Sequence, residues 1–158
     1  MERQNYEKEA LEKMISIANR NNCKYCMGQN NVNSIPIRGL VKFQFGDFRI
    51  DTNDKHFVIE LESAGGATNL VKYWYFLNDE NILSKKIINK PIILFHIFRQ
   101  ISENDYLSHL LLWDFLWDKM KNSLGDKIIA KRYTYRGLED LSIIYDEFEK
   151  ILKTDLKK

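Results

Sequence analysis

Acidic residues at alternate positions of an otherwise apolar segment are the feature that most constrains this chain. Residues 56–62 read HFVIELE, in which apolar side chains alternate with polar positions that include Glu60 and Glu62. This alternation predicts a β-strand, because successive side chains of a strand point to opposite faces of its sheet. A glycine-containing turn and an aromatic helix, predicted over residues 68–77, follow directly. The segment therefore places two carboxylates on one face of a sheet, beside a helix.

The residues before this strand predict a hairpin that brings a third acid to the same place. A strand predicted over residues 47–51 is followed by Asn-Asp at 53–54, and both residue types tolerate the positive φ angles of tight turns. With these two as the turn, Asp47 lies opposite Glu60, and their Cβ atoms are ~5 Å apart. Glu62 lies on the same face. Three acids would then converge at one end of the hairpin.

Asp51 is a second candidate for the acid of the first hairpin strand. In the simple register it faces His56 near the turn, away from Glu60, and a β-bulge at Gly46 or a shifted turn would change that arrangement. We prefer Asp47. A simpler interpretation also stays open, in which the polar face of the hairpin is solvated and its acids are surface residues.

The rest of the hydrophobic pattern predicts an α/β fold with a mixed central β-sheet flanked by helices. The unbroken apolar run over residues 92–98 is typical of a strand buried on both faces of a parallel sheet. The helix predicted over 104–122 is apolar almost all round, so we expect it to be covered on most sides. The predicted order is α-β-β-β-α-β-α-β-α, with helices at 5–20, 68–77, 104–122 and 138–152 and strands at 40–45, 47–51, 56–62, 92–98 and 127–133. The length predicts one domain, 1–158.

Three carboxylates this close repel one another unless something offsets their charge. A hard divalent cation such as Mg²⁺ prefers carboxylate oxygens and usually keeps several waters. Placed here, it can activate a water, orient a phosphate and neutralise a leaving oxygen. We therefore expect a Mg²⁺ or Mn²⁺ site at this end of the hairpin.

The order of elements and the three acids resemble the PD-(D/E)xK nuclease superfamily, which includes many restriction endonucleases and Holliday-junction resolvases. Its core is α-β-β-β-α-β, here followed by a C-terminal helix. Its motif is an Asp early in the second strand and Asp/Glu-x-Lys in the third. In this chain Asp47 follows Gly46 rather than proline, and Glu60-Leu61-Glu62 stands in place of Asp/Glu-x-Lys. The resemblance implies a metal-dependent nuclease that hydrolyses phosphodiester bonds, and we expect DNA rather than RNA as its substrate.

The resemblance also implies roles for individual residues. Asp47 and Glu60 would bind the metal, together with the Leu61 carbonyl, and Glu62 or Lys72 would act on the attacking water. Lys72 replaces the missing motif lysine from the following helix, as happens in some family members.

An acid on the first helix is a further implied site residue, and Glu9 or Glu12 would supply it. The missing motif lysine also keeps an alternative open: a catalytically inactive nuclease-like module that binds nucleic acid or another protein.

Contacts with nucleic acid are predicted from Asn69, which shares the face of Lys72 on its helix, and from a basic tract over residues 127–136. No acid interrupts this tract, which can neutralise phosphates without reading sequence. An edge strand guarded by Lys and Arg against aggregation explains it equally well. The four basic residues of the tract are Lys127, Lys131, Arg132 and Arg136.

The remaining features constrain function less. Cys23 and Cys26 have the spacing of half a zinc site, but without a second such pair we expect free thiols. We expect His96 to be a core histidine and His56 to be exposed. The net charge of +2 excludes a strongly basic protein. No secretory signal and no stretch of ~18 apolar residues is present, so we expect a cytoplasmic protein without a membrane span. The sequence leaves a homodimer open.

Overall fold

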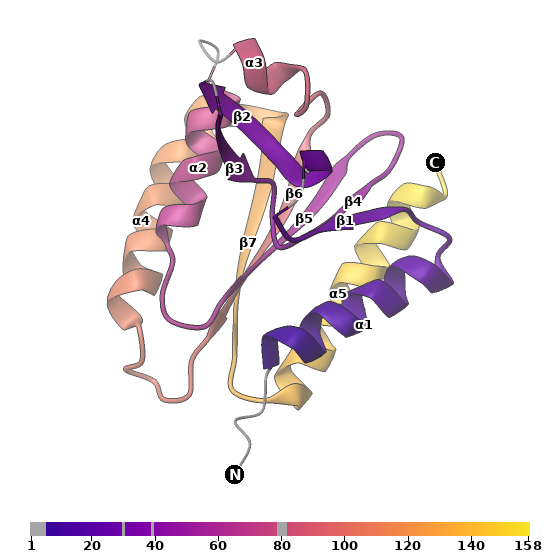
Figure 1. The fold of residues 1–158 in the computed structure, drawn as a ribbon. Coiled ribbons are helices and arrows are strands. Elements are labelled where there is room, and N and C mark those ends of the chain that lie inside the picture. The colour runs from indigo at the N-terminus through magenta and orange to yellow at the C-terminus, as the bar shows by residue number, and fades with distance from the viewer. Residues whose placement is uncertain (1–5, 30, 39, 79–81) are drawn as a thin grey trace.

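A five-stranded mixed sheet forms the centre of the protein (Figure 1). The computed structural model describes residues 6–29, 31–38, 40–78 and 82–158. In spatial order the strands are β1 (Tyr25–Met27), β4 (Phe48–Asp51), β5 (His56–Glu62), β6 (Ile92–Arg99) and β7 (Ile128–Tyr135). The first three pair antiparallel, while β5–β6 and β6–β7 are parallel. The expected α/β fold with a mixed central sheet flanked by helices is confirmed.

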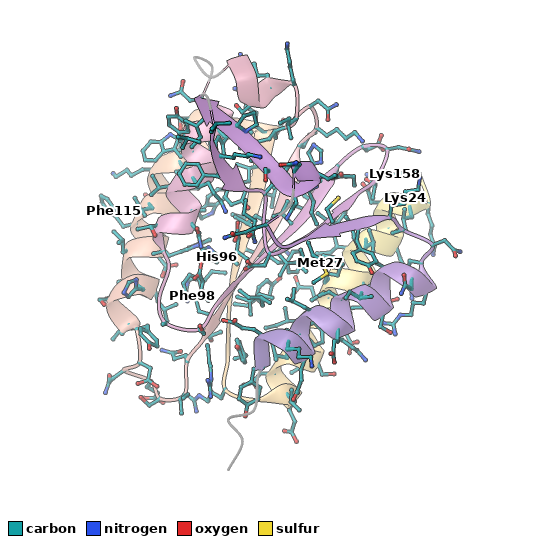
Figure 2. The ribbon with its side chains drawn as sticks, viewed as in Figure 1. Lys24, Met27, His96, Phe98, Phe115 and Lys158 are labelled. Atoms are coloured by element: carbon teal, nitrogen blue, oxygen red, sulfur yellow. The ribbon has the colours of Figure 1, made fainter. Side chains whose placement is uncertain are left out.

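Helices cover both faces of this sheet. The terminal helices α1 and α5 pack on one face, and α2 and α4 pack on the other (Figure 1). His96 and Phe98, labelled in Figure 2, point from β6 into the layer under α2 and α4. The helices are α1 (Tyr6–Arg20), α2 (Thr68–Leu77), α3 (Ile82–Lys85), α4 (Leu107–Leu124) and α5 (Leu138–Leu156), with short 3₁₀ turns η1 (Asn31–Asn33) and η2 (Gly125–Lys127). No helix in the described ranges is long and apolar enough to cross a membrane.

The expected three-strand meander is wrong in its first strand. β3 (Val41–Gln44) pairs with β2 (Ser34–Arg38) in a separate two-stranded sheet instead of joining the central one. Three of the four β3 residues are exposed, so β3 lies at the surface and not in the buried central sheet. The edge position of the central sheet belongs to β1, whose three residues are too few to show a period in the sequence.

The hairpin of β4 and β5 has the expected register. Phe48 pairs with Ile59, and Asp51 pairs with His56. The two residue numbers of each pair add up to the same value, as a two-residue turn at 53–54 requires. The ladder ends before Asp47, whose amide donates to the Ile59 carbonyl at 2.9 Å. Asp47 and Phe48, the first residue of β4, thus both face Ile59 of β5, which is the pattern of a β-bulge. The predicted direct pairing of Asp47 with Glu60 does not form.

The bulge depends on Gly46. Its φ of 81° lies in the left-handed region, and a Cβ there would be 2.5 Å from Val58 Cγ1. Only glycine fits this conformation without displacing a core side chain. The residue that stands where the nuclease motif has proline therefore bends the backbone and sets the direction in which Asp47 points.

Candidate functional site

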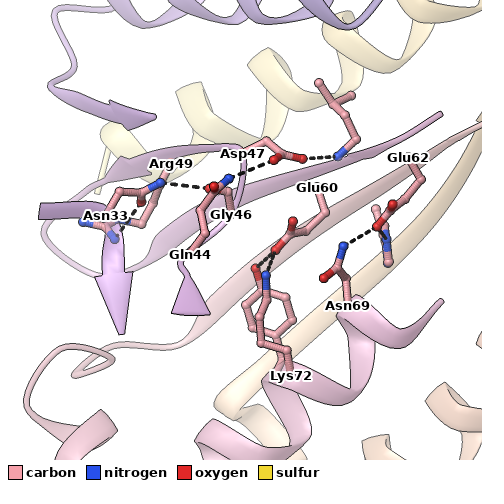
Figure 3. A network of polar contacts seen from close by, with 12 residues as sticks. Asn33, Gln44, Gly46, Asp47, Arg49, Glu60, Glu62, Asn69 and Lys72 are labelled. Carbon is pink, nitrogen blue, oxygen red and sulfur yellow. Dashed lines mark hydrogen bonds and ion pairs between the residues drawn. The ribbon is translucent and has the colours of Figure 1, made fainter. Parts of the chain in front are cut away.

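Glu60 lies at the centre of a polar cluster between β5 and α2 (Figure 3). One of its carboxylate oxygens, Oε1, accepts hydrogen bonds from Lys72 Nζ and from the Tyr73 hydroxyl. Its side chain is 3% exposed and that of Lys72 is 7% exposed. Burial raises the pKa of Glu60, and the attraction of Lys72 opposes this shift. A buried ion pair thus joins the predicted metal ligand to the predicted catalytic lysine.

Burial of Glu60 contradicts the interpretation of this hairpin face as solvated. The face of β5 that carries Glu60 also carries Val58, which packs in the core under α2 and α4. The helices therefore cover the acidic face, and the apolar face packs against α1 and α5. Buried carboxylates need hydrogen-bond donors or charge partners, and each acid of this cluster has them.

Asp47 points to the same region from the bulge. Leu61 N donates to its Oδ2 at 2.7 Å, and Gln44 Nε2 donates to its Oδ1 at 2.9 Å. Burial raises the pKa of Asp47; the amide of Leu61 and the charge of Lys72 lower it, and the charge of Glu62 raises it. Asp47 therefore lies within electrostatic range of both Lys72 and Glu62.

Glu62 is the third acid of the cluster, one step along the same face of β5. Its Oε1 accepts from Asn69 Nδ2 at 2.6 Å and is 2.8 Å from His96 Nε2. Its side chain is 12% exposed. Burial raises its pKa from 4.5 to about 7, although the hydrogen bond from Asn69 and the charge of Lys72 oppose the shift. At neutral pH this carboxyl is poised between its two protonation states.

His96 holds Glu62 through a defined tautomer. Trp113 Nε1, which can only donate, lies 2.9 Å from His96 Nδ1, so Nδ1 is the acceptor and Nε2 carries the proton. The Nε2–H therefore donates to Glu62. Burial lowers the pKa of His96 to about 3, so the ring is neutral at physiological pH. The expectation of a core histidine is right about its burial but misses its contact with the cluster.

The glycine pair after β5 lets the loop fold over Glu62. Gly65 and Gly66 have φ angles of 93° and 115°. A Cβ on Gly66 would overlap the Glu62 carboxylate, and one on Gly65 would lie 2.7 Å from His109 Cε1. Gly66 N donates to His109 Nδ1 at 3.4 Å. His109, from α4, thus borders the site, which no sequence pattern had indicated.

Asp51 lies at the opposite end of the hairpin. It pairs with Arg49 at 3.0 Å and with His56 Nδ1 at 2.6 Å. Burial alone would raise the pKa of Asp51, but the His56 hydrogen bond and the Arg49 charge bring it below its ordinary value. His56 itself is 4% exposed, contrary to expectation, because the Phe45 ring packs against it. The register separates this group from Glu60, so Asp47 is the acid that joins the cluster and Asp51 is not.

The two first-helix acids expected at the site do not reach it. Glu12 is exposed and pairs with Lys8 at 3.9 Å along α1. Glu9 lies near Tyr145, whose pKa its charge raises. Glu7, which lies two residues before Glu9 in the first turn of α1, is the acid of this helix whose charge raises the pKa of Glu62. The helix therefore reaches the cluster electrostatically through a different residue.

The basic tract does not form one surface. Lys131 pairs with Glu147 of α5 at 2.6 Å, whereas Arg132 pairs with Asp114 of α4 at 2.9 Å, so the two lie on opposite faces of β7. Strand alternation separates neighbouring residues in this way. β7 is an edge strand of the central sheet. This agrees with the alternative interpretation, in which the Lys and Arg residues guard an edge against aggregation.

The flanking residues of the tract are also separated. Lys127 donates to the Leu77 carbonyl at 3.4 Å below the amino end of β7, and Arg136 is exposed beyond its carboxyl end. Asn69, grouped with the tract by prediction, instead hydrogen-bonds Glu62 in the cluster.

No metal-binding group is preformed in the described part of the chain, and this includes the acids of the cluster. Cys23 and Cys26 are free thiols, as predicted. In the described part of the chain no three His, Cys, Asp or Glu side chains are grouped around one point as ligands. Each carboxylate of the cluster instead accepts hydrogen bonds from protein donors.

Comparisons with protein-family models, with curated proteins and with solved structures found no match to this chain.

Proposed function

We propose that this chain is a metal-dependent nuclease of the PD-(D/E)xK type that hydrolyses phosphodiester bonds of nucleic acid, and we favour DNA over RNA as its substrate. One observation carries the proposal. Asp47, Glu60, Glu62 and Lys72, which the resemblance groups into one active site, come from three separate segments and meet at one end of the hairpin.

The order of elements supports the same proposal. With β1 as the first strand, the chain runs α1–β1–β4–β5–α2–β6, with three antiparallel strands followed by a parallel one. Apart from the β2–β3 sheet and the short helix α3, this order agrees with the α-β-β-β-α-β order that the resemblance implies. The acids occupy the second and third strands of that order.

The donor set fits a hard divalent cation. Asp47 and Glu60 supply carboxylate oxygens, and both have raised pKa values because burial disfavours their charged forms. A cation favours the charged form and offsets that burial. Asp47, Glu60 and the Leu61 carbonyl would hold Mg²⁺ or Mn²⁺, with the cation taking over from Lys72 as the partner of Glu60. Bound there, the metal would supply charge neutralisation at the phosphate.

The residues of the chain have separate tasks in this proposal. Glu62, with a pKa of about 7, accepts a proton from the attacking water, and His96 and Asn69 hold its carboxylate in place. Lys72, released from Glu60, places a positive charge beside the phosphate oxygens. Tyr73 keeps its hydrogen bond to Glu60 and so fixes that ligand.

The nucleic acid would approach the carboxyl ends of the parallel strands. Glu62 ends β5, Arg99 ends β6 and Arg136 follows β7, and ligands of such sheets bind at this edge. The Arg99 guanidinium lies 4.7 Å from the Tyr6 ring centroid, and no described carboxylate pairs with it. Arginines without an acidic partner can bind phosphates bidentately. We assign the phosphate contacts to these two arginines rather than to Lys131 and Arg132, whose charges are already paired.

A nicking assay with matched variants tests the proposal. Supercoiled plasmid is incubated with Mg²⁺ or Mn²⁺ and wild type, Asp47→Asn, Glu60→Gln or Asp51→Asn, each checked for folding by circular dichroism. We expect Asp47→Asn and Glu60→Gln to lose about 100-fold or more of the activity, and Asp51→Asn to stay within about threefold of wild type. Equal rates in all four proteins would refute the site assignment.

A second candidate function is a nuclease-like module that binds nucleic acid without cutting it. The specific observation in its favour is that all three carboxylates are already satisfied by protein donors, with Lys72 bound to Glu60. Calorimetry separates the two functions. Mn²⁺ binding that disappears in Glu60→Gln favours the nuclease, whereas DNA binding without metal binding or cleavage favours the module.

A further inference from the structure

Helix α4 carries large apolar side chains on its outer face. Leu107, Leu111, Leu112 and Phe115 are 42%, 61%, 43% and 59% exposed, and we call these four residues the α4 apolar face. Phe115 is labelled on the outer side of the helix in Figure 2. The expectation that this helix is covered on most sides is therefore wrong.

The α4 apolar face lies opposite the face that packs on the sheet. Leu110, Trp113, Met120 and Leu124 are the buried residues of the helix and belong to the core under α2 and α4. Leu107, Leu111 and Phe115 follow one another at intervals of four, so they form a line along the helix. The helix is apolar on two opposite sides, and the described chain covers one of them.

Neighbouring α2 extends the exposed surface. Val71 and Tyr75, also at an interval of four, are 40% and 51% exposed on the helix that packs beside α4 (Figure 1). Large exposed apolar side chains that gather on one side of a soluble protein mark contact surfaces.

We propose that the α4 apolar face binds the same face of a second copy of this chain, with the two α4 helices antiparallel about a two-fold axis near Leu111. The inference does not depend on the proposed nuclease activity.

The distribution of charge at the two ends of α4 supports this occupant. Glu103 and Asp105 lie in the turn just before the helix, and Lys119 and Lys121 lie in its last turns, with Lys121 also paired with Asp118 at 2.7 Å. A two-fold axis at Leu111 therefore brings the acidic turn before α4 of one copy towards the end of α4 that carries Lys119 in the other. An antiparallel pair thus joins opposite charges at both ends, whereas a parallel pair would join like charges.

Two further features agree with antiparallel pairing. Leu107 of one copy meets Phe115 of the other, so a small and a large side chain fill each end of the contact. Lys119 Nζ lies 5.5 Å from the centroid of its own Phe115 ring, which places its ammonium group at the border of the α4 apolar face. Antiparallel helices also align their dipoles favourably.

The mixed charge around the face argues against a lipid surface. Asp114 and Asp118 lie on the same helix, with side chains 51% and 63% exposed. Anionic lipids attract surfaces framed by Lys and Arg, and acids at the rim would repel them. A protein surface with both signs of charge fits better.

Sedimentation equilibrium and light scattering test the proposal. Protein concentrations of about 5–300 µM suit the weak association expected of a small interface. We expect the wild-type mass to rise from monomer towards dimer with concentration. Leu111→Glu/Phe115→Glu should stay monomeric, with the dissociation constant raised more than about 100-fold, because four charges would be buried at the axis. Ile143→Glu, at a 71% exposed apolar position on α5, is the matched control and should dimerise like wild type.

A charge exchange tests the antiparallel arrangement. Lys119→Glu should raise the dissociation constant about five- to tenfold, and adding Glu103→Lys should restore it, because the exchanged pair attracts again. A wild type that stays monomeric at every concentration overturns the proposal and leaves the face to a different protein. A double exchange that weakens dimerisation further overturns the antiparallel geometry.

Discussion

The raised pKa of Glu62 makes the stability of this protein depend on pH in a defined direction. Its folded-state pKa is about 7, against 4.5 for the unconstrained side chain. The folded state binds the proton more tightly, so the Glu62 contribution to stability is full below pH 4.5 and is lost as pH rises through about 7. The difference between the two pKa values corresponds to about 3 kcal/mol. Since the side chain is 12% exposed, solvent screening reduces this value little.

Replacing Glu62 by glutamine isolates this contribution. Glutamine keeps an oxygen that accepts from Asn69 and His96, but it carries no charge at any pH. We expect Glu62→Gln to match wild type near pH 5 and to be about 3 kcal/mol more stable near pH 8. Glu60 also has a raised pKa and titrates in both proteins, whereas the pKa of Asp47 falls in the variant because the Glu62 charge no longer raises it.

Urea unfolding in the presence of a chelator, repeated from pH 5 to pH 8, measures this difference. Glu139→Gln, which changes an exposed glutamate of α5, is the control and should give a curve parallel to wild type. Parallel curves for Glu62→Gln and wild type would refute the reasoning, because they would mean that burial does not shift Glu62. Adding Mg²⁺ or Mn²⁺ should shrink the difference at pH 8, because a bound cation stabilises the carboxylate.

Two further substitutions test the residues that support the cluster. Trp113→Phe removes the donor to His96 Nδ1 and leaves a buried acceptor unpaired, so we expect a loss of about 1–3 kcal/mol in urea unfolding and a lower nicking rate. Gly66→Ala should cost about 2 kcal/mol or more in thermal unfolding, because its Cβ would overlap the Glu62 carboxylate at a φ of 115°. Gly125→Ala is its control: the φ of 53° is also left-handed, but no atom lies within 4 Å of the added Cβ, so the cost should stay near 1 kcal/mol. A Gly66→Ala protein as stable as Gly125→Ala would contradict the close contact with Glu62.

Sequence patterns predicted the elements that hold the site. The predicted strand 56–62 and helix 68–77 coincide with β5 and α2, because strict alternation and an aromatic helical segment bounded by glycines leave few alternatives. The hairpin register followed from the turn at 53–54. These two elements place Glu60, Glu62 and Lys72 without any knowledge of the tertiary structure.

The rest of the site depends on contacts that sequence patterns do not contain. His96 reaches Glu62 only because β6 lies parallel to β5 in a register that the α2 crossover sets. The bulge that directs Asp47 comes from one glycine pressed against Val58. The division of the basic tract, by contrast, could have been predicted from the sequence. Lys131 and Arg132 are neighbours in a predicted strand, and alternation places neighbouring side chains on opposite faces of the sheet.

The hydrogen bonds around Glu62 also disfavour a lysine at position 62. The ring of His96 can only donate towards position 62, because Trp113 fixes its other nitrogen as the acceptor. A lysine there would place an ammonium group, which also only donates, against that N–H in a buried site. Glu62→Lys, which restores the family motif, should therefore lower stability by about 2–4 kcal/mol and abolish nicking. A Glu62→Lys protein that is as stable as wild type and cuts faster would show that the lysine of α2 does not replace the motif lysine.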